Sequence, residues 1–197
     1  MAIRAPEFRA YIKMPTIDDA EILAENANDP DVARMVAKRG EFPHPYTKAN
    51  ASSFIEFAQF AAKSGVEFHF GIYSMATDKI MGMIALMRNQ SEQDPKTMEV
   101  GYWLGKPYWG QGYAKEALLL ALKFGFEDIG LDRVVAETTG DNARSIRVLE
   151  HAKFSRYAPD AQPNGANPDP KLHYELKREG YERLKLSDER MGRIYST

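Results

Sequence analysis

The chain of 197 residues contains no cysteine. Disulfide bonds, thiolate metal sites and a cysteine nucleophile are therefore excluded for this chain. Its four histidines, His44, His69, His151 and His173, lie far apart in the sequence, and no two have the spacing of a metal-ligand pair, so we expect no metal site. No apolar run approaches ~18 residues, and the N-terminal MAIRAPEFRA lacks a signal-peptide core. We expect a cytoplasmic protein that does not contact a membrane.

The chain also lacks a strong charge of either sign. Its 26 Lys and Arg residues against 28 Asp and Glu residues give a net charge of −2, which argues against nucleic acid as a partner. The length suits a single domain, and no internal repeat is evident. We therefore expect one domain over residues 1–197, with a core of about 8–178 and a charged tail over 180–197. Five apolar residues of the tail are candidates for docking a last helix: Tyr181, Leu184, Leu186, Met191 and Ile194.

Apolar periodicity and capping residues predict the order of the elements. Strands are expected at residues 8–14, 67–74, 80–88, 99–104, 133–139, 154–157 and 172–177. Helices are expected at 16–27, 30–36, 47–63, from the loop at 109–114 to near 130, and at 142–152. Thr16 with Asp19 forms a capping box, and Thr47 and Asn142 are N-cap candidates. Residues 54, 55, 57, 58 and 61 should form the buried stripe of the third helix. The order indicates an α+β fold, in which one mixed, mostly antiparallel sheet is flanked by helices.

The chemistry centres on residues 99–121, EVGYWLGKPYWGQGYAKEALLLA. A short strand is followed there by a glycine-punctuated loop and a long helix. Gly110, Gly112 and Ala114 have no side chain large enough to keep a ligand from the backbone, so the amides of residues 110–115 can converge on one point. That point is a helix N-terminus, where unpaired N–H groups and the helix dipole favour an anion. The stretch predicts a phosphate or pyrophosphate site.

Spacing separates three kinds of phosphate loop. A dinucleotide fingerprint counted from Gly110 and Gly112 would need a small residue where Lys115 stands, and a P-loop would need Ser or Thr where Pro107 stands. The third kind, Gln/Arg-x-x-Gly-x-Gly/Ala, is the loop of the GNAT acetyltransferases. It matches at Gly112-Tyr-Ala114, with Trp109 in the Gln/Arg position. Taken alone, the pattern is equally compatible with a plain glycine-bearing helix entry.

Three motifs together resemble the GNAT N-acetyltransferases, specifically the RimJ/RimL-type branch that acetylates the N-termini of ribosomal proteins. They are Glu99-Val-Gly-Tyr-Trp-Leu104, Tyr108-Trp-Gly-Gln-Gly-Tyr-Ala-Lys-Glu-Ala117 and Asp141-Asn-Ala-Arg-Ser-Ile-Arg-Val-Leu-Glu150. The resemblance covers about residues 8–178 and implies acetyl-CoA as the co-substrate. It implies the pyrophosphate on the amides of residues 111–115 and the pantetheine arm along strand 99–104. The implied cofactor-binding residues are Trp103, Leu104, Trp109, Gly110, Gln111, Gly112, Tyr113, Ala114, Lys115, Asn142 and Ser145.

The chain departs from the family pattern at two places. Many GNAT enzymes carry a tyrosine seven residues after the asparagine to meet the departing thiolate, whereas this chain has Leu149; Ser145 matches the serine of the RimJ/RimL-type pattern instead. Where relatives close the following helix with Gly-Phe, this chain has Lys153-Phe154. A left-handed cap at Lys153 would be strained by roughly 1 kcal/mol, so the helix end could differ.

The implied reaction is direct attack of an amine on a thioester. A free amine with a pKa of ~8 or above is largely protonated at neutral pH and must first lose a proton. Glu99 is the best candidate to accept it, provided that the carboxylate is partly desolvated. The alternative for Glu99 is a surface ion pair. Glu137 is the second candidate base, with a structural salt bridge as its alternative.

Three further groups have candidate roles in the transfer. Ser145 would donate a hydrogen bond to the leaving sulfur or be only a first-turn hydroxyl. Asn142 would hold the pantetheine or be only an N-cap. The backbone near Leu104 could supply the oxyanion donor, typically worth ~3 kcal/mol. Four aromatic side chains fit packing better than ligand stacking: Trp103, Tyr108, Trp109 and Tyr113.

The acceptor pocket should lie across the sheet from the cofactor. We expect residues 40–46, residues 159–170 and strand 99–104 to wall it. The family resemblance favours a protein or peptide N-terminus as the amine, with an aminoglycoside or polyamine as the alternative. A non-catalytic acyl-CoA-binding module is the alternative to an enzyme. The sequence leaves a monomer and a homodimer equally open.

Overall fold

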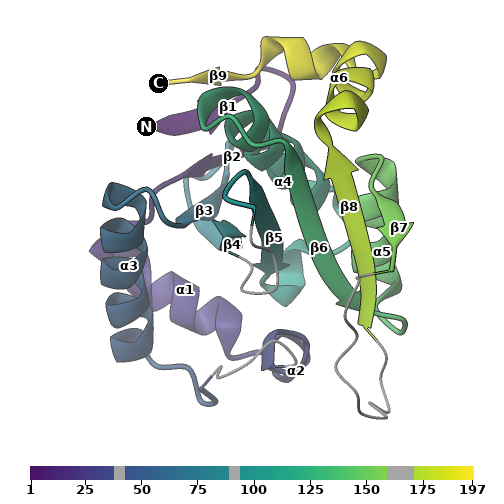
Figure 1. Ribbon diagram of the computed structural model, residues 1–197. Coiled ribbons are helices and arrows are strands. Elements are labelled where there is room, and N and C mark those ends of the chain that lie inside the picture. The colour runs from purple at the N-terminus through teal and green to yellow at the C-terminus, as the bar shows by residue number, and fades with distance from the viewer. Residues whose placement is uncertain (38–42, 89–93, 159–170) are drawn as a thin grey trace.

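The computed structural model describes residues 1–37, 43–88, 94–158 and 171–197. Within them the strands form one nine-stranded sheet in the order β7-β8-β6-β5-β4-β3-β2-β1-β9 (Figure 1). Neighbouring strands are antiparallel except β5 and β6, which are parallel. The strands are β1 (Ala2–Arg4), β2 (Ala10–Lys13), β3 (Phe68–Ser74), β4 (Ile80–Met87), β5 (Thr97–Leu104), β6 (Arg133–Thr139), β7 (Ser155–Tyr157), β8 (Lys171–Lys177) and β9 (Tyr195–Ser196).

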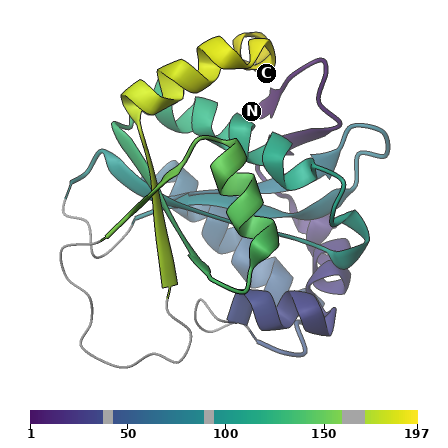
Figure 2. The same cartoon turned by 90° about the vertical axis from the view of Figure 1, so that its right-hand side faces the viewer.

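Helices cover both faces of this sheet (Figures 1 and 2). They are α1 (Ala20–Ala27), α2 (Pro30–Ala37), α3 (Lys48–Lys63), α4 (Tyr113–Lys123), α5 (Ala143–His151) and α6 (Arg178–Ser187). The smaller of two core clusters joins α1 and α3 to Tyr11, Tyr73 and Met83 of the sheet. The larger cluster joins α4, α5 and α6 to Ile84 and Val100 on the opposite face. The predicted α+β fold with a mixed, mostly antiparallel sheet is confirmed.

Local sequence rules account for where several helices begin. Thr16 and Asp19 exchange the bonds of a capping box at the 3-10 turn that precedes α1. Thr47 caps α3, since its hydroxyl accepts from the amide of Asn50 at 3.2 Å. Asn142 caps α5, as its side-chain oxygen accepts from the amide of Ser145 at 3.2 Å. These side chains satisfy N–H groups that have no acceptor inside the helix, so the predicted N-termini are confirmed.

Helix α4 is the central element of the larger core. Seven consecutive residues, Glu116 to Leu122, are buried. A helix that is buried all round has no polar stripe, which explains why its sequence reads as a plain run of Ala and Leu. Its predicted extension toward Gly130 takes the form of a π-helical turn over Phe124–Asp128. This turn stacks Phe126 on Tyr181 of α6, with ring centroids 4.6 Å apart.

The two chain ends pair with each other, which the sequence did not predict. The amide of Ala2 donates to the carbonyl of Thr197 at 2.8 Å, and the amide of Thr197 returns a bond to Ala2 at 2.9 Å. This pairing places β1 between β2 and β9. Strands of three and two residues are too short to show an alternating pattern. The expected strand at 8–14 is shorter than predicted, at Ala10–Lys13.

Two burial predictions were wrong. Phe57 is 49% exposed and Leu186 is 86% exposed. In α3 the face that packs inward carries the small residues Ala51 and Ala58 around Ile55, so Phe57 falls outside it. The last helix did form as α6, and Tyr181 and Leu184 are buried in it. In the part of the chain that the structure describes, no helix is both long and apolar enough to cross a membrane.

Candidate functional site

The site is built around a gap between the two parallel strands. β5 and β6 pair at only three positions, Thr97 with Arg133, Met98 with Val134 and Glu99 with Val135. Beyond this point β5 continues to Leu104 against β4, while β6 continues to Thr139 against β8. The two strands diverge there, so the sheet opens between them. Backbone groups on the facing edges of this opening are placed to pair with something other than a neighbouring strand.

The N-terminus of α4 lies beside this opening. Gly112 is its N-cap and has a φ of +87°, and Gly110 has a φ of +73°. Both values lie in the left-handed region that side-chain-bearing residues rarely adopt, which gives the predicted glycines a specific conformational role. The first intrahelical bond runs from the amide of Glu116 to Gly112. The amides of residues 113–115 precede that bond and point out of the helix end.

A buried carboxylate holds this helix end against β2. Glu116 is 6% exposed and accepts from the amides of Arg9 at 2.8 Å and Ala10 at 2.9 Å. The Arg9 guanidinium bonds the same carboxylate at 3.3 Å and also reaches the carbonyl of Gln111. The glycine loop is thus tied to the start of β2 by charge-assisted hydrogen bonds, which fixes where the α4 amides point.

Two titratable groups near the α4 N-terminus, Lys115 and His151, have lowered pKa values. Burial lowers the pKa of Lys115, and the nearby Arg190 lowers it further. Burial also lowers the pKa of the His151 imidazole, with Lys115, Lys153 and Arg190 adding to the effect. Both shifts run in the direction that crowded, partly desolvated cations produce. An anion at this helix end would relieve that crowding.

One cavity of about 940 Å³ runs from this helix end through the opening to the other face of the sheet. Glu99 and Glu137, the two candidate bases, line it together with all but one of the predicted cofactor residues. The exception is Gln111, whose side-chain amide donates to the carbonyl of Pro107 at 2.7 Å. The predicted residues in the lining are Trp103, Leu104, Trp109, Gly110, Gly112, Tyr113, Ala114, Lys115, Asn142 and Ser145.

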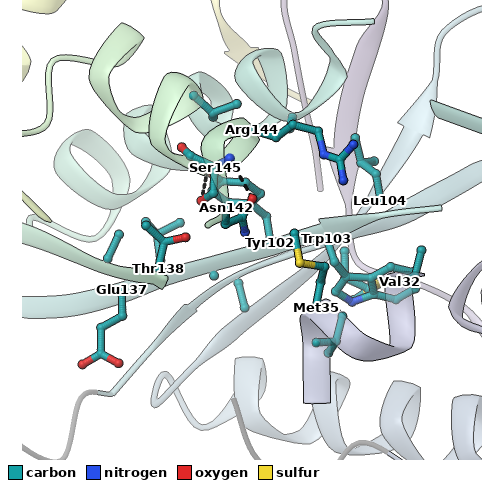
Figure 3. Close-up of a pocket in the computed structure, with 18 of the residues that line it drawn as sticks. Val32, Met35, Tyr102, Trp103, Leu104, Glu137, Thr138, Asn142, Arg144 and Ser145 are labelled. Atoms are coloured by element: carbon teal, nitrogen blue, oxygen red, sulfur yellow. Dashed lines mark hydrogen bonds between the residues drawn. The ribbon is translucent and has the colours of Figure 1, made fainter. Parts of the chain in front are cut away.

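The aromatic residue in the Gln/Arg position of the loop has a structural role. The indole N–H of Trp109 donates to the carbonyl of Leu104 at 2.7 Å, which joins the loop to the end of β5. The guanidinium of Arg144 lies over the Trp109 ring at 4.0 Å from its centroid. Arg144 also lines the cavity, and Figure 3 shows its side chain reaching across toward Leu104. Arg144 was not among the predicted site residues.

Helix α5 presents its first turn to the opening. Asn142 is occupied as the N-cap, and the Ser145 hydroxyl lies 3.1 Å from the hydroxyl of Tyr102 on β5 (Figure 3). Leu149, which replaces the tyrosine of many relatives, is 1% exposed in the core. The sequence did not single out Tyr102. Because side chains alternate between the two faces along a strand, Tyr102 lies on the same face as Leu104, two residues away. This spacing could have identified it as a site residue.

A third residue that the sequence missed is Thr138 on β6. Its hydroxyl is buried and, among the described residues, has no hydrogen-bond partner, yet the side chain lines the cavity. A buried hydroxyl without a partner costs free energy of about 1–3 kcal/mol. This orphaned group on the wall of the opening is therefore a place where a polar ligand atom would be favoured.

The two candidate bases differ in their surroundings. Glu99 is half-buried at the point where β5 and β6 part, opposite Met87 on β4 and Val135 on β6. Glu137 lies further along β6 and is engaged by Lys171 at 2.6 Å and by His173 at 3.4 Å. Glu137 thus makes the salt bridge that was considered for it. Both carboxylates are half-buried, which is the setting that a general base requires.

The helix end at residue 153 keeps the left-handed geometry despite the lysine. Lys153 has a φ of +63°. The amide of Phe154 donates to the carbonyl of Leu149 at 3.1 Å, which is the long bond of a Schellman motif. The helix end therefore has the same cap geometry that a Gly-Phe ending would give, and the predicted difference is not observed. The hydrogen bonds of the cap compensate the backbone strain at Lys153.

Together these features define an α+β domain with the open N-terminus of α4 on one side of a split sheet and a half-buried carboxylate on the other. Such a cavity can hold a phosphate-bearing ligand and a second reactant at the same time. The chain belongs to the GNAT acetyltransferase family, because residues 9–155 match the model of the acetyltransferase (GNAT) domain. The predicted family is confirmed, and the chain is accordingly an N-acetyltransferase.

Known proteins agree with this assignment. The chain is 27% identical over 149 residues to the uncharacterized N-acetyltransferase p20 of Bacillus licheniformis, covering 75% of this chain and 80% of that protein. A crystal structure of a GNAT-family acetyltransferase from Bacillus anthracis matches with a TM-score of 0.72 at 25% identity, covering 91% of this chain and 99% of that one. Mycobacterium smegmatis RimJ in complex with CoA-disulfide matches with a TM-score of 0.74 at 19% identity, over 100% and 96% of the two chains. At that identity the likeness to RimJ concerns the fold.

Proposed function

We propose that the protein transfers the acetyl group of acetyl-CoA to a primary amine, with a protein or peptide N-terminus as the favoured acceptor. The observation that carries this proposal is the opening between β5 and β6. The pairing of these strands ends at Glu99 and Val135, and one cavity continues through the opening from the α4 N-terminus to the opposite face. Two reactants can therefore approach each other from opposite faces of the sheet.

The cofactor side of the cavity fits a diphosphate and an amide-bearing arm. The amides of residues 113–115, together with Lys115, would hold the diphosphate. The amide of Gly105 donates to Met81 on β4, so the amide and carbonyl of the preceding residue, Leu104, point to the opening instead. The Leu104 amide and the orphaned Thr138 hydroxyl would bind polar atoms of the pantetheine or the thioester.

The acceptor side of the cavity supplies a base. Bound acetyl-CoA supplies an acyl group on a thiol leaving group. Glu99 would take the proton that the ammonium form of the acceptor must lose, and the neutral nitrogen then forms the new C–N bond as the C–S bond breaks. Direct attack suits a chain without cysteine. The thiolate takes up one proton, and the second proton of the original ammonium group reaches the solvent.

Ser145 is placed to assist the leaving sulfur. Its hydroxyl lines the cavity and is hydrogen-bonded to Tyr102, which also lines the cavity. An alcohol is a much weaker acid than a thiol, so Ser145 is better suited to donating a hydrogen bond to the sulfur than to giving up its proton. A hydrogen bond to a developing charge in a partly water-excluded site stabilises the transition state.

The favoured acceptor class rests on the resemblance of the three motifs to the RimJ/RimL-type branch. An aminoglycoside or polyamine is the alternative within the same activity. A non-catalytic acyl-CoA-binding module is the alternative outside it. Such a module would keep the α4 helix end but would have no working base.

The experiment is Glu99→Gln with two separate readouts, acetyl-CoA affinity by calorimetry and release of free CoA thiol with a panel of amines. We expect the dissociation constant to stay within about 2-fold while kcat falls by 100-fold or more. Glu25→Gln, an exposed position on α1 outside the cavity, is the charge-matched control and should change neither. Acetyl-CoA binding by the wild type without thiol release for any amine would identify the binding module instead.

A further inference from the structure

The acceptor face of the sheet has a recessed floor. Residues directly opposite one another on neighbouring strands share a face, and His69 on β3, Ala85 on β4 and Gly101 on β5 form one such row. The next row contains Met83 and Trp103, and both pack in the core cluster beneath α1 and α3. This assigns the row to the face opposite α4.

Longer side chains flank this row on both sides. Met83 and Trp103 stand on one side, and Met87 and Glu99 stand on the other. Since Ala85 has only a methyl group and Gly101 has no side chain, the floor at these two positions is lower than the side chains on either side. This recess is called the trough. All six residues line the cavity that passes through the opening: Met83, Ala85, Met87, Glu99, Gly101 and Trp103.

Apolar side chains of α2 and α3 lie beside this trough. Val32 and Met35 of α2 and Phe54 of α3 line the same cavity, and Figure 3 shows Val32 and Met35 beside Trp103. Three methionines therefore contribute to its walls. Methionine side chains are flexible and polarisable, and they adapt to apolar groups of different shapes. The trough fits an apolar group better than a polar one.

Charge in the lining disfavours a polycation. Glu67 bonds His69 at 2.9 Å and Glu137 bonds Lys171 at 2.6 Å, so these two carboxylates of the lining are already engaged. Arg88 and Lys171 line the cavity as well. A polyamine or an aminoglycoside would bring several charges to a wall that offers few carboxylates for them.

We propose that the acceptor is a primary amine whose neighbouring carbon carries an apolar group about the size of a Leu, Met or Phe side chain. That group is seated on the floor formed by Ala85 and Gly101, and the nitrogen lies toward Glu99 at the edge of the trough. The proposal rests on the proposed function, because it assigns the second half of the same cavity. It narrows the acceptor from any amine to a hydrophobic one.

The test measures kcat/KM by thiol release for otherwise identical peptides beginning with Leu, Met, Phe, Gly or Ser. Isoamylamine, methylamine and spermidine form a second arm that separates free amines from peptide N-termini. We expect the Leu, Met and Phe peptides to exceed the Gly peptide by about 10-fold or more, since burying a larger apolar group in a matching pocket gives that order of discrimination. Spermidine should be the poorest acceptor.

Variants of the floor and wall link this preference to the trough. Ala85→Leu fills the floor and should reduce the Leu-to-Gly ratio by at least 10-fold, with the dissociation constant of acetyl-CoA unchanged as the sign of an intact fold. Met87→Ala widens the trough and should shift the preference toward Phe, which keeps a test available if Ala85→Leu fails to fold. Met75→Ala, at an exposed turn outside the cavity, is the matched control and should leave the ratio unchanged.

The outcomes separate this inference from the proposed function. Turnover with equal efficiency for Gly, Ser and Leu peptides, or best turnover with spermidine, would overturn the hydrophobic acceptor and leave the transferase intact. A preference for Leu that Ala85→Leu and Met87→Ala do not alter would also overturn it. Acetyl-CoA binding without turnover of any amine would overturn the proposed function itself.

Discussion

The left-handed glycine at the start of α4 offers the most informative perturbation. Gly112 has a φ of +87°, and a Cβ added there would lie 3.2 Å from the flexible end of Arg9. An alanine with this positive φ lowers the free energy of unfolding by about 1–2 kcal/mol. The lower conformational entropy of the unfolded chain offsets about 0.4–1 kcal/mol of that loss. We expect Gly112→Ala to lose about 1 kcal/mol of unfolding free energy, or roughly 2–4 °C in Tm for a chain of this size.

The same substitution should weaken cofactor binding by more than this stability loss explains. Turning the peptide at Gly112 moves the amides of the first helical turn, and a hydrogen bond to a charged group contributes about 1.5–3 kcal/mol. We therefore expect the dissociation constant of acetyl-CoA, measured by calorimetry, to rise by about 10- to 100-fold. This range corresponds to the loss of one amide contact to the diphosphate.

A matched control exists within the chain. Gly130 has a φ of +75° and open space around its Cβ position, and it lies outside the cavity. Gly130→Ala should show a similar loss of Tm with an unchanged dissociation constant. Unaltered acetyl-CoA affinity in Gly112→Ala, or an equal loss of affinity in Gly130→Ala, would refute the assignment of the diphosphate to the α4 amides.

Three further predictions follow from the same geometry. Glu116→Ala leaves the buried amides of Arg9 and Ala10 without an acceptor and should lower the unfolding free energy by about 3 kcal/mol in urea titrations; a loss below about 1 kcal/mol would contradict the anchoring role. Lys153→Gly relieves the left-handed strain and should raise the unfolding free energy by about 0.5–1 kcal/mol, and a decrease would contradict the strained cap. The pKa of His151 is lowered in the free protein, and a bound diphosphate should raise it. CoA binding should therefore take up protons at pH values between the pKa of the free protein and that of the complex, and weaken as the pH rises through that window. Calorimetry in buffers of different ionisation enthalpy measures this uptake. Binding without proton uptake would contradict it.

The parts of the site that the sequence predicted follow from local rules. A strand, two glycines and a helix N-terminus form one continuous segment from β5 to α4, so the geometry depends on neighbours in the chain. The capping residues Thr47 and Asn142 were predictable for the same reason. The glycines proved more specific than their small size suggested, because Gly110 and Gly112 adopt positive φ values.

The parts that the sequence missed depend on residues far apart in the chain. Ala2 and Thr197 pair across nearly the whole length of the sequence, in strands too short to show a pattern. The end of β5–β6 pairing after Glu99, which creates the opening, follows from how the two strands twist apart. The contact between Tyr102 and Ser145 exists only because β5 and α5 meet at that opening.

Some expectations fall on residues that the structure does not describe. The predicted connection over residues 159–170 lies outside the described residues, as do parts of those at 40–46 and 89–96. The acceptor walls that were assigned to residues 40–42 and 159–170 remain predictions. Pro43 and Tyr46, from the described part of the 40–46 segment, line the cavity as predicted. The rest of the described wall consists of α2, α3 and the strands β3 to β5, and the inference about the acceptor rests on these elements.

A crystal structure of the protein with bound CoA would show where the diphosphate and the pantetheine arm lie. We expect diphosphate oxygens within hydrogen-bonding distance of the backbone amides between Gly112 and Lys115, and a pantetheine arm that enters the gap beside Leu104 and Thr138. A diphosphate bound elsewhere on the molecule, or an arm that stays outside the gap, would contradict this expectation.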